Sequence, residues 1–283
     1  MTTFEEITIT LPHMNLAARR SGNPAGPKLL AIHGWLDNAA SFEPISPWFD
    51  EYDLVAIDLP GHGRSDHRPR GAWYHYIDYL HDVSTCIEAL QWQRFSLLGH
   101  SLGGAICSVL AAALSERVER LYLIEALGPL STPHEKTLGL LRAALADRAG
   151  VDAKKLRVFP SLDAPAAARR QHPQMPLSAA AAHALVARGT RAVAGGFVWS
   201  SDPRLTLTSA IRMTEEQVRN CLEGIQCPAH LVLADPAMPF VDFERMAERT
   251  ELVSTLTFTR IAGTHHLHMD MPEQVARALR ASG

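Results

Sequence analysis

Short apolar runs, each bounded by glycine or proline, recur along the first half of the chain. None of them alternates apolar with polar side chains, and they cover residues 28–34, 52–61, 94–101 and 120–129. Runs without alternation are typical of strands that are buried on both faces. Stretches with the apolar period of a helix separate several of these runs, at residues 77–91 and 102–118. The pattern therefore predicts βαβ units and an α/β fold built on a mostly parallel sheet.

Both ends of the chain extend this sheet. Residues 5–18 alternate around Pro12, as in an edge hairpin. After a helical stretch that opens with the capping-box pair Thr214 and Gln217, the strand pattern resumes in CPAHLVLAD and STLTFTRIAG. The chain then ends in the helical segment PEQVARALRAS.

Residues 130–212 interrupt the strand pattern. They contain alanine-rich helical segments and proline-containing loops, but no run that predicts a strand. We therefore expect a helical cap, or lid, inserted between two segments of one core, residues 1–129 and 213–283.

Composition and charge narrow the class of protein. With 283 residues, of which 47% are hydrophobic and 20% charged, the chain is long enough for one large core and its cap. Its 27 Lys and Arg against 30 Asp and Glu argue against nucleic acid as a partner. Four scattered cysteines, an acidic N-terminal segment and no apolar run of membrane-spanning length predict a reduced, cytoplasmic protein.

One region has an uneven charge. Residues 141–192 contain nine Lys and Arg but three Asp and Glu. This excess is expected for a solvated helical surface, which is the preferred interpretation; a surface that guides anionic acyl substrates or touches an anionic membrane is the alternative. The sequence leaves these alternatives open, and it predicts no oligomeric state.

The strongest chemical signal is Gly99-His100-Ser101-Leu102-Gly103, which lies between an apolar strand run and a small-residue helix. A serine on a tight strand-to-helix turn projects its hydroxyl above the sheet, and flanking glycines relieve the crowding of that turn. Ser101 is therefore the predicted nucleophile.

Two backbone amides are candidates for an oxyanion hole. Trp35 follows the first buried strand in His33-Gly34-Trp35, and its amide can pair with that of Leu102 to stabilise a developing oxyanion. The Trp35 side chain is expected as a core aromatic near the pocket mouth. Asp58 and His62 lie in the turn DLPGHGRSD, and we expect them to be structural.

A general base is expected in GTHHLHMDMPEQVA, where three histidines fall on the loop before the last helix. His265 is the candidate, His266 is the alternative, and His268 is expected to pack or hydrogen-bond on the loop. Because the nearest acidic residue in sequence is a single Asp270, we expect neither a zinc site nor another cofactor.

Two carboxylates qualify as the partner of the base. Glu125 follows RLYLI just before Gly128-Pro129, and Asp235 follows AHLVL. Pro236 biases Asp235 toward an extended backbone, which limits how it can turn toward His265. Glu125 is therefore the expected acid and Asp235 the alternative.

The strings HGWLDN, DLPGHGRSD, GHSLGG and HHLHMDMPEQVA, in this order, resemble the α/β-hydrolase superfamily, in its serine-hydrolase-like branch. The resemblance covers roughly residues 5–129 and 213–283. It implies an eight-stranded sheet, a lid, and a triad in the order nucleophile, acid, histidine. Counting back from Pro272 in the family pattern also selects His265. The family's acid would be expected near Ala237, whereas Glu125 resembles the glutamate of one haloalkane dehalogenase branch.

The expected activity is hydrolysis of carboxylic esters through an acyl-enzyme, of carboxylesterase or lipase type, with a Ser-His-Glu triad. The substrate would be a small-molecule acyl ester. Epoxide hydrolases and haloalkane dehalogenases of this superfamily use an aspartate where this chain has Ser101, and the cap here has no tyrosine. A cofactor-free perhydrolase, a carbon-carbon bond hydrolase and a non-catalytic binding protein stay open as alternatives.

Overall fold

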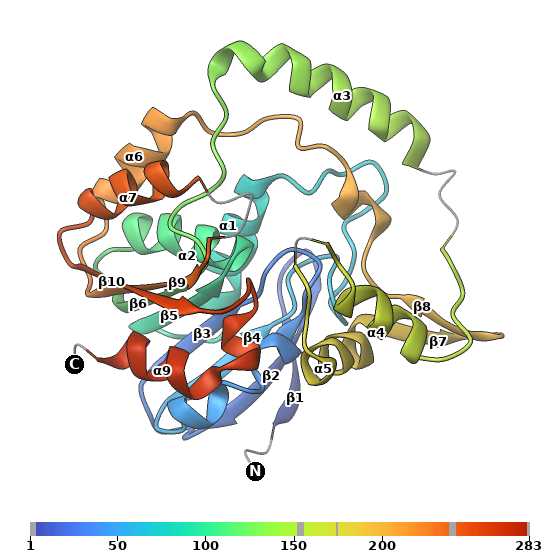
Figure 1. Cartoon of the computed structure of the whole chain (residues 1–283), viewed down its shortest axis with the longest axis horizontal. Coiled ribbons are helices and arrows are strands. Elements are labelled where there is room, and N and C mark those ends of the chain that lie inside the picture. The colour runs from blue at the N-terminus through green and yellow to red at the C-terminus, as the bar shows by residue number, and fades with distance from the viewer. Residues whose placement is uncertain (1–3, 152–155, 174, 238–241, 282–283) are drawn as a thin grey trace.

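The computed structural model describes residues 4–151, 156–173, 175–237 and 242–281. An eight-stranded sheet, in the order β1-β2-β4-β3-β5-β6-β9-β10, runs through its centre (Figure 1). Strand β2 pairs antiparallel with both of its neighbours, β1 and β4. All other pairs, from β4 to β10 in this order, are parallel. The strands are β1 (Glu5–Thr10), β2 (Asn15–Gly22), β3 (Lys28–Ile32), β4 (Asp53–Ile57), β5 (Phe95–His100), β6 (Val118–Ile124), β9 (Ala229–Asp235) and β10 (Leu256–Ala262). The predicted fold class and strand number are confirmed.

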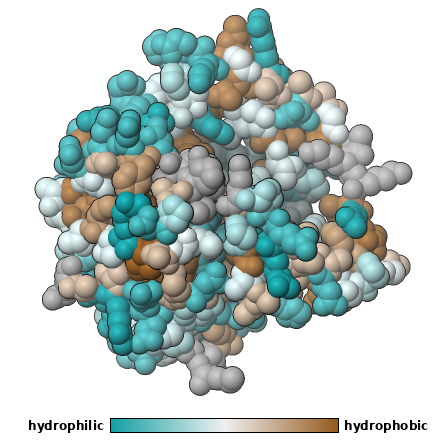
Figure 2. Space-filling view, viewed as in Figure 1, coloured by the Kyte–Doolittle hydropathy of each residue, from teal (hydrophilic) through white to brown (hydrophobic). Residues whose placement is uncertain are grey.

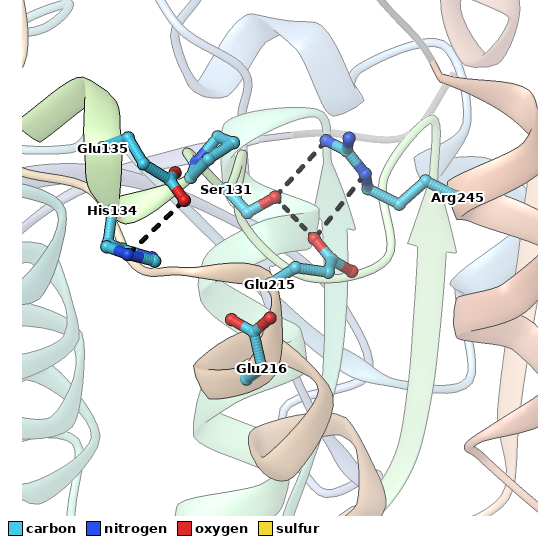
Figure 3. A pocket seen from close by; sticks show the side chains of 7 residues that line it. Ser131, His134, Glu135, Glu215, Glu216 and Arg245 are labelled. Atoms are coloured by element: carbon cyan, nitrogen blue, oxygen red, sulfur yellow. Dashed lines mark hydrogen bonds and ion pairs between the residues drawn. The ribbon is translucent and has the colours of Figure 1, made fainter.

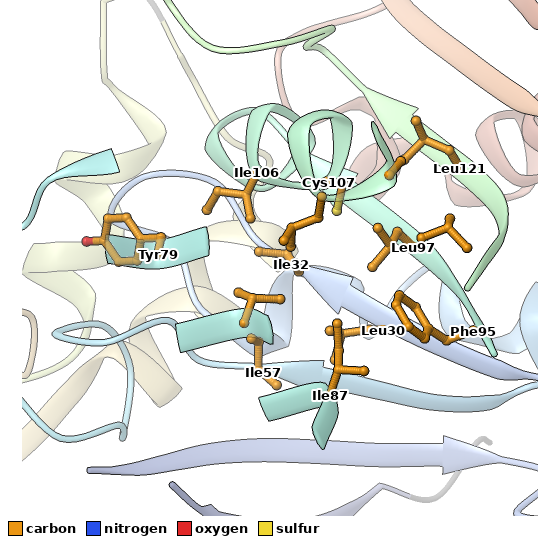
Figure 4. Close-up of a cluster of buried hydrophobic side chains, with 14 of the residues drawn as sticks. Leu30, Ile32, Ile57, Tyr79, Ile87, Phe95, Leu97, Ile106, Cys107 and Leu121 are labelled. Atoms are coloured by element: carbon orange, nitrogen blue, oxygen red, sulfur yellow. The ribbon is translucent and has the colours of Figure 1, made fainter. Parts of the chain in front are cut away.

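Neighbouring residues of the central strands point to opposite faces of the sheet, which explains why these runs do not alternate. Leu30 and Ile32 pack in one apolar cluster together with Ile106, and Figure 4 shows this cluster. Leu29 and Ala31 belong to a second cluster on the other face. Both faces are thus covered, as a parallel sheet requires.

Helices form a layer on each face. The first cluster takes side chains from α1 (Tyr76–Ala89), α2 (Leu102–Ala113), α6 (Glu215–Glu223) and α7 (Phe243–Glu251). The second takes them from α9 (Pro272–Arg280) and two short 3-10 helices, η1 (Ala39–Phe42) and η2 (Ser46–Phe49). A short helix, α8 (Leu267–Asp270), precedes α9. The capping box predicted at Thr214 and Gln217 is present at the start of α6.

Residues 130–212 connect β6 to α6 outside the sheet, and α3 arches at the top of the view in Figure 1. Residues 152–155 and 174 of this range lie outside the described residues. The elements are η3 (His134–Lys136), α3 (Thr137–Gly150), α4 (Asp163–Arg170), α5 (Ala179–Gly189), β7 (Thr190–Val193), β8 (Gly196–Trp199) and η5 (Pro203–Thr206). The expectation of no strand here is wrong, because β7 and β8 form an antiparallel hairpin that turns through Gly195 at φ 86°.

A buried arginine ties this segment to the core. Arg188, at the end of α5, has its Nε 3.0 Å from the carboxylate of Asp58 and its Nη1 2.7 Å from Glu6. Asp58 is itself buried and also accepts the amide of Ala39 at 2.7 Å. Asp58 thus has the contacts of a structural residue, as expected from its turn.

Hydrophilic and hydrophobic residues are interspersed over the face seen in Figure 2. Exposed leucines include Leu138, Leu141 and Leu145 on α3. Among the described residues, no helix combines the length and the apolar character needed to cross a bilayer. All four cysteines are free.

Candidate active site

Ser101 occupies the sharp turn from β5 into α2. Its backbone has φ 52° and ψ −114°, a sparsely populated positive-φ conformation that costs a non-glycine residue about 1–3 kcal/mol. The turn is tight because the two elements touch: a Cβ on Gly99 would lie 2.5 Å from the carbonyl oxygen of Gly103. A Cβ on Gly103 would lie 1.8 Å from the carbonyl oxygen of Ile32 in β3. Both glycines of the predicted motif are therefore required by packing.

His265 and Glu125 meet in the interior. Glu125 directly follows β6, with a positive φ of 62°, and its Oε2 lies 3.0 Å from His265 Nδ1. Its other oxygen, Oε1, accepts the backbone amide of Ala234 at 2.5 Å. The alternative acid, Asp235, instead pairs with Arg260 at 2.6 Å and has a side chain that is 53% exposed. The structure therefore brings Glu125 to His265 and turns Asp235 to the surface.

Burial sets the charge state of this pair. Burial and the neighbouring His100 together lower the pKa of His265 to about 3, and burial is the larger cause. Burial also raises the pKa of Glu125, although the amide of Ala234 opposes this shift. His265 is thus a neutral imidazole, and a carboxylate at Nδ1 requires that nitrogen to donate. Nε2 then carries the lone pair that a general base needs.

The loop after β3 lies against Ser101. A Cβ on Gly34 would come within 3.2 Å of the Ser101 Cβ, so the following residue, Trp35, begins next to Ser101. Within the described residues, the amides of Trp35 and Leu102 donate to no backbone acceptor. The Trp35 side chain is not the expected core aromatic: it is 46% exposed, and its indole donates to the carbonyl of Leu205 in η5.

The other two histidines of the loop have different partners. His266 Nε2 lies 2.9 Å from Asp37 Oδ2, and His268 Nε2 lies 2.7 Å from the hydroxyl of Ser41. Asp37 also pairs with Arg169 of α4. Although burial alone would raise the pKa of Asp37, His266 and Arg169 hold it well below its usual value.

Sequence reasoning missed Asp37. It took Asp270 as the acidic neighbour of the three histidines, whereas the structure places Asp37 there. Asp37 lies 229 positions before His266, in HGWLDN. The available signal was its place just after a buried strand, because the carboxyl ends of parallel strands meet at one edge of the sheet.

A separate pocket of about 190 Å³ lies where residues 130–212 leave and rejoin the core. In Figure 3, Ser131 points toward Glu215 and Arg245. Its lining contains none of Ser101, Glu125 and His265. This pocket is therefore distinct from the candidate active site.

Comparisons with known proteins extend over nearly the whole chain. The family model described as the alpha/beta hydrolase fold matches residues 27–182. A serine hydrolase-like protein of Danio rerio is 32% identical, over 97% of this chain and 86% of that protein. A solved structure of a hypothetical protein from Pseudomonas aeruginosa PAO1 has a TM-score of 0.91 at 39% identity and covers 98% of both chains. A thioesterase domain from the curacin biosynthetic pathway has a TM-score of 0.84 at 25% identity, over 98% of this chain and 99% of that one.

Proposed function

The chain belongs to the α/β-hydrolase family, in its serine-hydrolase-like branch, and on that basis we propose that it hydrolyses carboxylic esters with a Ser101-His265-Glu125 triad. The observation that carries the proposal is the 3.0 Å contact between His265 Nδ1 and Glu125 Oε2, because Glu125 and the strained Ser101 directly follow the carboxyl ends of the neighbouring parallel strands β6 and β5. Acyl transfer by a serine hydrolase needs a serine on a strained turn, a neutral imidazole, and a carboxylate at Nδ1 of that imidazole.

In the proposed mechanism Ser101 Oγ attacks the acyl carbonyl while His265 Nε2 takes its proton. Glu125 keeps His265 in the donating Nδ1 tautomer and stabilises the imidazolium that forms. The amides of Trp35 and Leu102 stabilise the tetrahedral oxyanion. His265 then protonates the leaving alcohol, and water releases the acid from the acyl-enzyme by the same steps. The chemistry uses only these groups and water.

We assign residues 130–212 as the cap of this site, with residues 1–129 and 213–283 as the core. The cap's apolar cluster, which includes Leu177, Leu185 and Val186, packs against Met269 of α8, close to the base. The cap would therefore border the bound acyl chain and set its preferred length.

A fluorophosphonate probe and a chain-length series of p-nitrophenyl esters test the proposal together. The probe should label Ser101, and the ester series should give turnover that depends on acyl length. Failure of the folded protein to react with the probe would favour the alternative of a non-catalytic binding protein. Labelling without ester turnover would instead favour a perhydrolase or a carbon-carbon bond hydrolase.

Thioesters are a second substrate class to compare. The specific observation is the 25% identical thioesterase domain that covers almost the full chain. Matched oxygen esters and thioesters of the same acyl group separate the two, because only the leaving group differs. A kcat/KM that is higher for the thioester beyond its greater intrinsic reactivity would move the assignment to that class.

A further inference from the structure

Asp37 lies at the centre of a second group of polar side chains beside the proposed triad. Its Oδ2 is 2.9 Å from His266 Nε2 and 3.6 Å from His100 Nδ1. One donor atom from each of the three residues lies within 4.8 Å of the others. All three side chains are buried and almost without solvent contact.

The hydrogen bonding of His100 fixes which of its nitrogens carries the proton. Nε2 lies 2.8 Å from the carbonyl oxygen of His265, which can only accept, so Nε2 donates. In the neutral ring, Nδ1 then holds a lone pair that faces the carboxylate of Asp37. Within the described part of the chain this buried Nδ1 has no hydrogen-bond partner. Two electron-rich atoms that face each other without solvent are unfavourable unless a proton or a metal cation lies between them.

We propose that Asp37, His100 and His266 bind one divalent transition-metal ion of the zinc type. Two imidazoles and a carboxylate are a donor set that zinc and its neighbours prefer, and three protein ligands leave a fourth position for water. His100 also has the outer contact that metal-ligating histidines usually make, a hydrogen bond from the second ring nitrogen to a backbone carbonyl.

Metal binding requires a change of tautomer at His266. Its Nε2 donates a hydrogen to Asp37 when no metal is bound, and this hydrogen moves to Nδ1 when Nε2 becomes a ligand, so the ring stays neutral and no net proton is released. No oxidation or reduction is involved, because zinc keeps its charge.

Arg169 competes with the ion for the same carboxylate. Its guanidinium pairs with Asp37 Oδ1, which leaves Oδ2 as the oxygen shared by the two histidines. The positive charge on Arg169 repels a divalent cation at this distance. Removal of the Arg169 side chain, which belongs to α4, should therefore strengthen metal binding, whereas removal of the Asp37 carboxylate should weaken it.

Metal binding and hydrolysis are separate properties but adjacent in space. His100 holds the carbonyl of His265, and His266 is the next residue, so an ion on both histidines restrains the backbone of the proposed base. We therefore expect the ion to inhibit ester hydrolysis reversibly. This effect rests on the proposed function, whereas the binding itself does not.

The test is a titration of chelator-stripped protein with Zn²⁺ by equilibrium dialysis, and with Co²⁺ by its visible absorption. One ion should bind per chain, with the spectrum of mixed nitrogen and oxygen ligation. Asp37→Asn and His266→Gln should each weaken binding by more than about tenfold, and Arg169→Gln should strengthen it several-fold. Ser101→Ala should bind the ion as the unaltered chain does, which keeps this test independent of the hydrolase proposal.

Two further variants are matched controls. His268→Gln alters a buried histidine whose ring lies 4.3 Å from that of His100 but outside the donor set, and His183→Gln alters an exposed one. Neither should change the metal affinity. Binding that persists in Asp37→Asn, or that is lost equally in either control, would mean an adventitious ion only and would overturn the proposal. If circular dichroism shows that Asp37→Asn is unfolded, His266→Gln decides.

Discussion

Glu125 and His265 stand 140 positions apart in the sequence, yet Glu125 Oε2 lies 3.0 Å from His265 Nδ1. Glu125 directly follows β6, which neighbours β5, the strand before Ser101, and His265 follows the edge strand β10. Between them lies β9, whose residue Ala234 donates its amide to the second oxygen of Glu125. Strand β9 therefore helps to position the carboxylate without supplying it.

The first prediction distinguishes the two candidate acids. Glu125→Gln should lower kcat by about 10³- to 10⁴-fold, because the amide no longer enforces the tautomer of His265. Asp235→Asn should keep most of the activity, since Asp235 pairs with Arg260 at the surface. Steady-state kinetics with one p-nitrophenyl ester measures kcat for both variants. The opposite ranking would assign the role of the acid to Asp235, at the end of β9.

The nucleophile gives the second prediction. Ser101→Ala should lower kcat by about 10⁶-fold, as loss of the attacking group does in serine hydrolases. The fold should persist, because the substitution removes one hydroxyl. Mass spectrometry should find no fluorophosphonate adduct, and a labelled variant would place the nucleophile elsewhere.

A third prediction separates adjacent histidines. His265→Ala should abolish ester turnover, because it removes the ring that contacts Glu125. His266→Ala should reduce turnover only in part, since His266 contacts Asp37 instead. Reaction with the probe at saturating concentration reports the activation of Ser101 directly. Equal or reversed effects would contradict the assignment of the base.

The fourth prediction concerns the link between the cap and the core. Arg188→Met should lower the free energy of unfolding by about 3 kcal/mol, because it leaves the buried carboxylate of Asp58 unpaired. The double variant with Asp58→Asn should recover part of this loss. Urea unfolding measures both, and Arg191→Met, at an exposed position on β7, is the control. If Arg188→Met and Arg191→Met had the same free energy of unfolding, a stabilising role for Arg188 would be excluded.

Stability should also fall on acidification. Burial lowers the pKa of His33 to about 4 and that of His62 to about 3, from 6.5 in the unfolded chain. Below about pH 6.5 the unfolded chain binds protons that the folded protein does not, so the folded state loses stability from there down to about pH 4. The melting temperature measured across this range should decrease as the pH falls. His62→Gln should make the decrease shallower, while His183→Gln should leave it unchanged.

The sheet was predictable because burial on both faces leaves a local signature. Leu29 to Ile32 point to alternate faces, and both faces are apolar, so the sequence shows a continuous apolar run. The serine turn was predictable for the same local reason: Gly99 and Gly103 have no room for a Cβ.

Other features depend on contacts between distant segments, and sequence patterns do not record these. Arg188 and Asp58 are 130 positions apart, and nothing near either residue indicates the other. The β7–β8 hairpin was missed because its strands are short and follow an alanine-rich helix directly. The only local signal was the pair Gly195-Gly196 between two apolar segments.

The position of Glu125 immediately before the proposed cap has a consequence for any exchange of residues 130–212 with the same segment of a relative. Here a grafted cap would join the core within a few residues of Glu125, so the graft would alter the attachment of a proposed catalytic side chain along with the pocket. His265 is distant from either junction along the chain, so the graft would leave its own backbone attachment unchanged. New specificity and efficient turnover would therefore have to be selected together, and successful chimaeras should carry compensating changes around Gly128 and Pro129.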